Sequence, residues 1–235
     1  NGQADMLRIW NRELTSAEIT WLYNSGSGRS YSALSGGGGA SYLIEENFEG
    51  TGTPTGWSVT NGSADFDATP PSNSPNGGKV LKFTDRNNEV EYSISTSSAL
   101  YLYFQFYVDS TGYSATEIVT LDMGDNSHNA SLYLKSSASS NLLLRSRYNN
   151  ESATVNAYQE DTWYHCWMYF NPATGEQNLE FNTTGTRSGS GDGFVTRTVA
   201  TNSSSISKLK IEGRRNANTY IDRVLISESV IGNNP

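Results

Sequence analysis

The clearest indication of the fold is the stretch Ala99–Asp109, which reads "ALYLYFQFYVD". Every second residue from Leu102 to Val108 is a large apolar side chain, and polar or aromatic residues stand between them. Because neighbouring side chains of a β-strand point to opposite faces, this alternation predicts a strand with one apolar and one tyrosine-rich face. We therefore expect the apolar face to lie in the core of a β-sheet protein.

The same alternation recurs on both sides of this stretch. Thr162–Asn182, "TWYHCWMYFNPATGEQNLEFN", predicts a hairpin with Cys166 and Met168 on one face and a turn within "NPATGEQ". Shorter alternating runs occupy 131–135, 141–148, 206–213 and 219–231. Many short strands without helices between them indicate an all-β protein, an antiparallel two-sheet jelly-roll sandwich.

Composition and charge agree with this class and exclude several partners. Apolar residues make up 35% of the 235 residues and charged residues 17%, and the chain contains 22 glycines and 14 tyrosines. Such a mixture suits short strands joined by polar turns. The net charge of −8 argues against a nucleic-acid partner, and no apolar run has the roughly 18 residues needed for membrane insertion.

The N-terminal stretch Ala4–Tyr31 predicts a strand followed by one short helix, in which Thr15 and Glu18 form a capping box. Its "ADMLRIWNREL" matches "YIDRVLISESV" near the C-terminus, since both place an Asp before alternating apolar residues. We therefore expect residues 1–31 to be the end of a preceding jelly-roll domain, 32–41 a Gly/Ser-rich linker, and 42–235 a complete domain. The lone terminal strand should pack against the main domain or a neighbouring molecule.

Three stretches resemble known jelly rolls. The segment "DMLRIWNRELTSAEITWLY" resembles the closing strand and helix of laminin-G-like, concanavalin A-like domains, and "DTWYHCWMYFNPATGEQNLEFN" resembles their central hairpin. "EENFEGTGTPTGWSVTNGSA", together with "YIDRVLIS", is similar to carbohydrate-binding-module jelly rolls. The resemblance covers nearly the whole chain and implies a concanavalin A-like jelly-roll sandwich.

The resemblance also implies a structural calcium ion. In such jelly rolls a Ca²⁺ often ties the opening strand to the closing one, and the matching residues here are Glu49 and Asp222. Asp65 and Asp67 could contribute oxygen ligands, because alternation puts both on one side of their strand. The alternative is that these are ordinary surface acids of an acidic protein.

No catalytic constellation emerges from the sequence. The two histidines, His128 and His165, and the single Cys166 lack zinc-ligand spacing, and adjacent strand residues cannot form a His–Cys dyad. We also find no strand with the paired carboxylates that a glycosidase requires. Catalytic residues are therefore predicted to be absent.

Aromatic side chains on the polar faces of two strands are the candidate binding residues. They are Tyr101, Tyr103, Tyr107, His165, Trp167 and Tyr169. Aromatic rings stack on the C–H faces of sugars, so an aromatic stripe predicts a glycan platform. A subunit interface and a half-buried sheet surface would produce the same pattern.

The sequence favours a non-catalytic recognition module, carbohydrate-binding or adhesive, that is secreted, surface-displayed or carried on a virus particle. A second hypothesis is a structural component, such as a phage decoration or tail protein or an extracellular filament, joined to other copies through its N-terminal strand. A polysaccharide-cleaving enzyme is a third. All three use one fold, so the fold does not choose among them.

Overall fold

The computed structural model describes ten ranges of the chain: 42–71, 74–85, 87–109, 116–122, 129–135, 141–146, 152–189, 193–198, 205–213 and 217–233. The predicted N-terminal strand, short helix and linker lie outside the described residues, so their domain assignment and packing stay predictions. Within the described ranges, no helix is long and apolar enough to cross a membrane.

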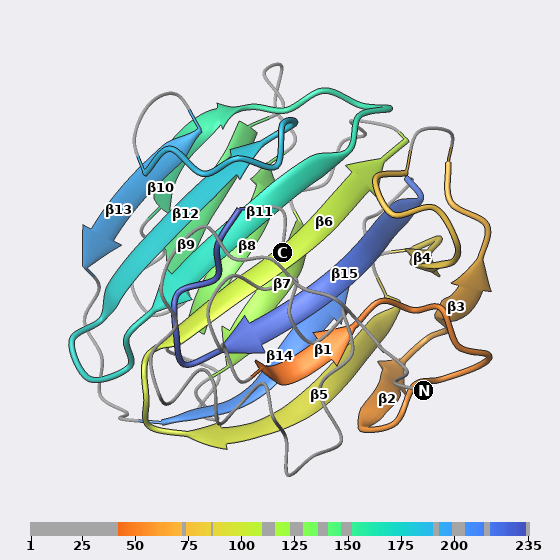
Figure 1. Ribbon diagram of the computed structural model, residues 1–235, viewed down its shortest axis with the longest axis horizontal. Coiled ribbons are helices and arrows are strands. Elements are labelled where there is room, and N and C mark those ends of the chain that lie inside the picture. Colours follow the sequence, from red (N-terminus) through yellow and green to blue (C-terminus); the bar gives the residue numbers. More distant parts are fainter. Residues whose placement is uncertain are drawn as a thin grey trace, which may run out of the picture. The chain divides into compact units, whose positions relative to one another are not determined.

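The described strands form two antiparallel sheets, as the alternation predicted (Figure 1). The eight-stranded sheet contains, in spatial order, β13 (Phe194–Thr198), β12 (Glu176–Asn182), β11 (Tyr164–Phe170), β6 (Leu100–Val108), β15 (Thr219–Ser227), β4 (Val80–Phe83) and β3 (Asp65–Ala68), with β1 (Tyr42–Glu46) also paired to β15. The seven-stranded sheet contains β10 (Ser152–Ala157), β9 (Asn141–Ser146), β8 (Asn129–Lys135), β7 (Thr116–Asp122), β14 (Ile206–Glu212), β5 (Glu89–Thr96) and β2 (Trp57–Asn61). Figure 1 shows β11, β6 and β15 side by side in one layer, with β7, β8 and β14 in the layer behind.

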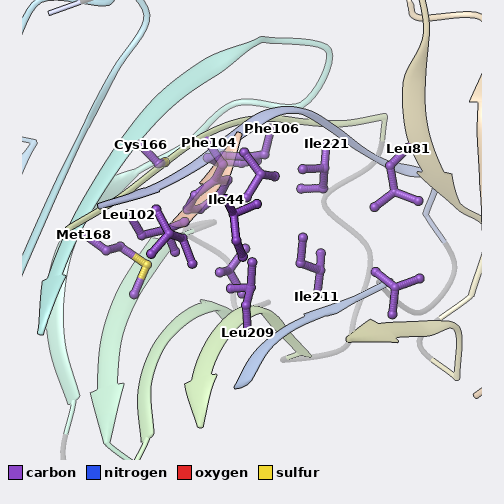
Figure 2. Packing of buried hydrophobic residues seen from close by; sticks show 14 of the residues in the cluster. Ile44, Leu81, Leu102, Phe104, Phe106, Cys166, Met168, Leu209, Ile211 and Ile221 are labelled. Carbon is purple, nitrogen blue, oxygen red and sulfur yellow. The ribbon is translucent and has the colours of Figure 1, made fainter. Parts of the chain in front are cut away.

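The core lies between the sheets and contains the apolar residues that the alternation assigned to it. Leu102, Phe104 and Phe106 of β6 are at most 1% exposed, and Cys166 and Met168 of β11 lie in the same cluster. Figure 2 shows side chains of β14 pointing across the gap toward those of the opposite sheet. Cys166 is therefore a small core residue, as its position in the alternating run predicted.

The hairpin between β11 and β12 closes with the turn predicted from "NPATGEQ". The Asn171 side-chain oxygen accepts hydrogen bonds from the backbone N–H groups of Ala173 (3.0 Å) and Thr174 (3.3 Å). Gly175 has a φ of 75°, a left-handed conformation that glycine adopts without strain. This turn sets a register in which Trp167 lies opposite Glu180 and Tyr169 opposite Asn178.

The closing strand β15 contains a bulge that the sequence did not reveal. Asp222 pairs with Gln105 of β6, but Leu225 pairs with Tyr103, so β15 carries one extra residue at this point. Arg223 has a φ of 43° within the bulge. As a result Asp222 and Leu225 both face away from the core, although strict alternation would separate them.

Candidate functional site

The predicted aromatic residues lie on the outward face of the eight-stranded sheet. Tyr101 is paired with Tyr169 and Tyr103 with Trp167 across β6 and β11, and His165 is opposite Gln105. The Tyr101 and Tyr169 rings are 4.8 Å apart between centroids, and the Tyr103 and Trp167 rings 5.3 Å. We call this surface of β6, β11 and β12 the aromatic face.

Much of the aromatic face is covered. Tyr103, His165 and Trp167 are buried, and the segment after β15 folds back over Tyr103 and Trp167. Ile231 of this segment is 1% exposed and packs with Tyr103 and Trp167, and the Trp167 indole N–H donates to the Gly232 carbonyl (3.2 Å). Only Tyr101 and Tyr169 among the six predicted residues are partly exposed.

Tyr107 belongs to a different cluster at the other end of β6. It packs with Trp163, and its ring is 5.6 Å from that of Tyr220. Its hydroxyl donates to the Asp161 carboxylate (2.7 Å). Desolvation and that carboxylate raise the pKa of Tyr107, so it stays a neutral structural residue. The six predicted residues therefore do not form one continuous platform.

A series of hydrogen bonds connects the uncharged side chains of Asn76, Gln105, Tyr103 and His165. The Asn76 amide N–H donates to the Gln105 side-chain oxygen (2.9 Å), and the Gln105 amide N–H donates to the Tyr103 hydroxyl (2.8 Å). The Tyr103 oxygen is 2.7 Å from His165 Nδ1. Gln105 already donates to this oxygen, so an accepting Nδ1 gives the hydroxyl hydrogen a partner, whereas an Nδ1–H would leave that hydrogen without an acceptor in this series of bonds.

Burial favours the neutral form of His165, and the hydrogen bond to Tyr103 favours one tautomer of it. Burial lowers the pKa of His165 from 6.5, which favours the neutral ring, and burial raises the pKa of Tyr103, which keeps the phenol protonated. A neutral imidazole that accepts at Nδ1 carries its hydrogen on Nε2. The geometry thus assigns the Nε2–H tautomer to His165.

Next to the Tyr101–Tyr169 pair, the aromatic face is hollowed. The hollow is shallow and partly open to solvent, with room for about one water molecule. It is lined by Tyr101, Leu102, Trp167, Met168, Tyr169, Asn178, Glu180, Arg187, Phe194 and Ile231. Burial raises the pKa of Tyr101, so its phenol stays protonated. The hollow therefore offers apolar ring surface beside amide, carboxylate, guanidinium and phenol groups.

Glu180 and Arg187 hold one wall of this hollow. Glu180 is 3% exposed, and its carboxylate accepts the backbone N–H groups of Ser188 (2.5 Å) and Gly189 (3.1 Å). These bonds return the loop after β12 to the sheet and bring Arg187 Nε within 3.6 Å of Glu180 Oε2. That separation makes an ion pair but is too long for a hydrogen bond. The wall is thus built around a charge pair with little solvent access.

Sequence reasoning missed the polar half of this hollow. Asn178 and Glu180 lie in the second strand of the predicted hairpin, and the observed register places them opposite Tyr169 and Trp167. Nothing in the sequence singles out Arg187, because its position depends on where an irregular loop returns. Gln105 was assigned to the outward face, but no pattern indicated that it would be buried there.

The predicted calcium residues, Glu49 and Asp222, are near each other. Burial is the main cause that raises the pKa of Asp222 to about 6, and the charge of Glu49 contributes in the same direction. Asp222 Oδ2 accepts from Asn76 Nδ2 and from the Ser74 hydroxyl, each at 3.3 Å, whereas the buried Oδ1 has no hydrogen-bond partner. Glu49 lies over Gly78, whose missing side chain leaves room for the carboxylate.

Asp65 and Asp67 lie on the same exposed side of β3, as predicted. Asp67 accepts the Gly52 backbone N–H (2.9 Å) and pairs with the Lys79 ammonium group (3.0 Å), and these contacts lower its pKa. The Lys79 backbone N–H in turn donates to Glu49 (3.2 Å). Asp67 therefore supports the loop that carries Glu49 and is itself engaged by a lysine.

Comparison with known proteins identifies the fold. No family model and no curated protein sequence matches the chain. Among solved structures, lectin II from Ulex europaeus aligns over 80% of this chain and 99% of its own, at 10% identity and a TM-score of 0.53. Basic winged bean lectin with Tn-antigen aligns over 78% and 97%, at 12% identity and a TM-score of 0.50.

A sialidase is also similar, with 16% identity and a TM-score of 0.55 over 80% of this chain, which spans only 18% of that protein. These structures and the present chain share two antiparallel sheets stacked as a sandwich, although their sequences have diverged widely. The chain has the concanavalin A-like jelly-roll fold that its alternating strands and its central hairpin indicated.

Proposed function

We propose that the protein is a non-catalytic carbohydrate-binding or adhesive module and that the hollow beside Tyr101 and Tyr169 is its glycan site. The observation that carries this proposal is the partly exposed ring pair, 4.8 Å apart, next to Asn178 and Glu180. Sugar recognition combines stacking on aromatic rings with hydrogen bonds from a few fixed polar groups. The lectin-like fold is compatible with this function but does not establish it.

The chemistry of the hollow also supports binding without cleavage. Glycosidases use two carboxyl groups about 5–10 Å apart across the scissile bond. Among the described residues that line the hollow, Glu180 is the only carboxylate, and backbone N–H groups and Arg187 already engage it. A carboxylate held in this way is suited to positioning a loop, so we assign it no role in acid–base catalysis.

A glycan array followed by isothermal titration tests this function. We expect the wild-type chain to bind at least one glycan class and Tyr169→Ala to weaken that binding at least about tenfold, or ~1.4 kcal/mol. Tyr220→Ala is the matched control, because Tyr220 is a partly exposed tyrosine of the same sheet outside the hollow. Absence of any bound glycan, or equal loss in both variants, would contradict the proposal.

We also propose a structural Ca²⁺ between the opening and closing strands, held by Asp222 and Glu49. The unpartnered, buried Oδ1 of Asp222 and the neighbouring Glu49 charge fit a divalent cation. No cluster of three or more Asp, Glu, His or Cys is present among the described residues, so further ligands would be amide, hydroxyl or carbonyl oxygens. When bound, the ion would neutralise both carboxylates and cross-link their loops.

Calcium titration with thermal unfolding tests this site. We expect Ca²⁺ to raise the melting temperature of the wild type but not of Asp222→Asn. Asp67→Asn should keep the calcium response, since Asp67 is already bound by Lys79. If Ca²⁺ raised the melting temperature of Asp222→Asn as much as that of the wild type, the ion would not bind at this position.

For location, we propose that the module acts outside the cell or on a virus particle, where surface glycans are available. Immunogold labelling of intact cells or particles tests this. Labelling confined to the cell interior would contradict it.

A further inference from the structure

The two charged side chains of the hollow are already paired with each other. Arg187 donates from Nη1 to the Ile231 carbonyl (3.1 Å), and its buried Nε faces Glu180. Glu180 is fixed by Ser188 and Gly189. Arg187 is the only cationic side chain among the described lining residues, and its charge is balanced by Glu180. The hollow therefore contains no unpaired cation for an acidic group, and Glu180 would repel one.

The hollow also contains a hydrogen-bond acceptor without a donor. Asn178 Oδ1 is buried and has no hydrogen-bond partner, although the residue as a whole is partly exposed. An unpaired buried acceptor costs about 1–3 kcal/mol. Because the side-chain amide of asparagine turns about a soft torsion, this oxygen can turn to meet a hydroxyl that enters the hollow. Asn178 Oδ1 requires a donor, which a sugar hydroxyl supplies and a carboxylate does not.

We infer that the hollow selects an uncharged pyranose, which stacks a C–H face on Tyr169 and Tyr101 and donates a hydroxyl to Asn178. This inference rests on the proposed glycan-binding function and specifies its ligand class. Uronic acids and other carboxylated sugars bind less well, because their charge meets Glu180 without a free cation to offset it. The net charge of −8 acts in the same direction at longer range.

The test uses pairs of oligosaccharides that are identical except that the C6 hydroxyl of one member is oxidised to a carboxylate. Wild-type protein is titrated with both members of each pair at low salt, where charge effects are strongest. We expect the neutral member to bind at least about tenfold more tightly, equivalent to ~1.4 kcal/mol. We also expect its affinity to change less than about twofold between 50 and 500 mM NaCl, because screening acts on charges.

Asn178→Leu sharpens the test. It removes the acceptor and keeps the branched shape and the number of side-chain heavy atoms, so neutral-sugar binding should fall at least about fivefold, while the melting temperature stays the same or rises. If the carboxylated member binds as well as or better than the neutral one, and Tyr169→Ala abolishes this binding, the inference is wrong while the glycan site stands. If no oligosaccharide of either kind binds to the wild type, the proposed function itself fails.

Discussion

The outward faces of the two sheets are built in opposite ways. On the eight-stranded sheet, rings and uncharged polar groups such as Trp167 and Gln105 are buried beneath loops and the segment after β15. On the seven-stranded sheet, a ladder of lysines and glutamates faces outward. Lys210 pairs with Glu89 (2.6 Å) and with Glu212 (2.5 Å).

The comparison shows that a sheet face that points away from the core can still be buried from solvent. Burial alone would lower the pKa of Lys210, but hydrogen bonds to Glu212 and Glu89 raise it, so the ladder stays ionised. Such ion pairs near the surface contribute little to stability. The covered face gains from apolar burial but loses free energy wherever a buried polar atom lacks a partner, as Asn178 Oδ1 does. We therefore expect substitutions on the two faces to differ in size and in their response to salt and pH.

The largest difference should come from Trp167. Trp167→Ala removes a side chain that is 3% exposed, and we expect it to lower the free energy of unfolding by about 3–5 kcal/mol. Lys208→Ala, on the seven-stranded sheet, should cost less than about 1 kcal/mol. Urea unfolding followed by circular dichroism measures both. Similar losses in the two variants would mean that the outward faces are equivalent.

The next largest effect is the pH dependence from Asp222. Its pKa is about 6 in the folded protein against 3.8 in the unfolded chain, so the charged form destabilises the fold above pH 6. In a chelator-containing buffer, the free energy of unfolding of the wild type relative to Asp222→Asn should therefore rise by about 2 kcal/mol from pH 7 to pH 4. Taking the difference cancels the titration of other groups. A difference that is independent of pH would show that Asp222 is well solvated.

The hydrogen-bond relay gives a smaller but more specific prediction. Tyr103→Phe removes the hydroxyl that contacts Gln105 Nε2 and His165 Nδ1, so both atoms lose this partner, and the change should cost about 1–3 kcal/mol. Nitrogen-15 NMR of the wild type should show His165 with hydrogen on Nε2, and the Tyr103→Phe variant should lose this preference. The substitution Tyr220→Phe, at a tyrosine outside the relay, should leave the His165 signals unchanged. An Nδ1–H tautomer in the wild type would refute the relay.

The smallest change in the free energy of unfolding is expected for the lysine–glutamate pairs on the seven-stranded sheet. Lys210→Met breaks the pairs with Glu89 and Glu212, and should cost about 1 kcal/mol or less at low salt. The loss should shrink in 1 M NaCl, because screening already weakens these pairs in the wild type. For Trp167→Ala the loss should not depend on salt. A salt-independent loss in Lys210→Met would show that the ladder acts through packing of the lysine stem.

The strands, their faces and the turn of the central hairpin could be predicted from local sequence patterns. Alternation with a period of two follows from local backbone geometry, so Leu102, Phe104 and Cys166 could be assigned to the core without knowledge of their partners. The hairpin register follows from the short "NPATGEQ" turn, whose Asn171 and Gly175 act locally. The pairing of Tyr101 with Tyr169, by contrast, depends on β6 and β11 meeting across a long stretch of chain.

Which outward side chains are buried, and which polar groups contact one another, depends on tertiary contacts. Ile231 reaches Trp167 because the chain turns back after β15, and Arg187 reaches Glu180 because a loop returns to the sheet. Alternation along β15 places Asp222 on the outward face, beside Asn76 and Ser74, and the one-residue bulge at Arg223 brings Leu225 to the same face. These contacts join residues far apart in the sequence through irregular backbone, which has no periodicity to reveal it. For that reason alternation predicts which side chains face outward. It does not predict which of them the segment after β15 covers, which hydrogen bonds connect them, or where the hollow lies.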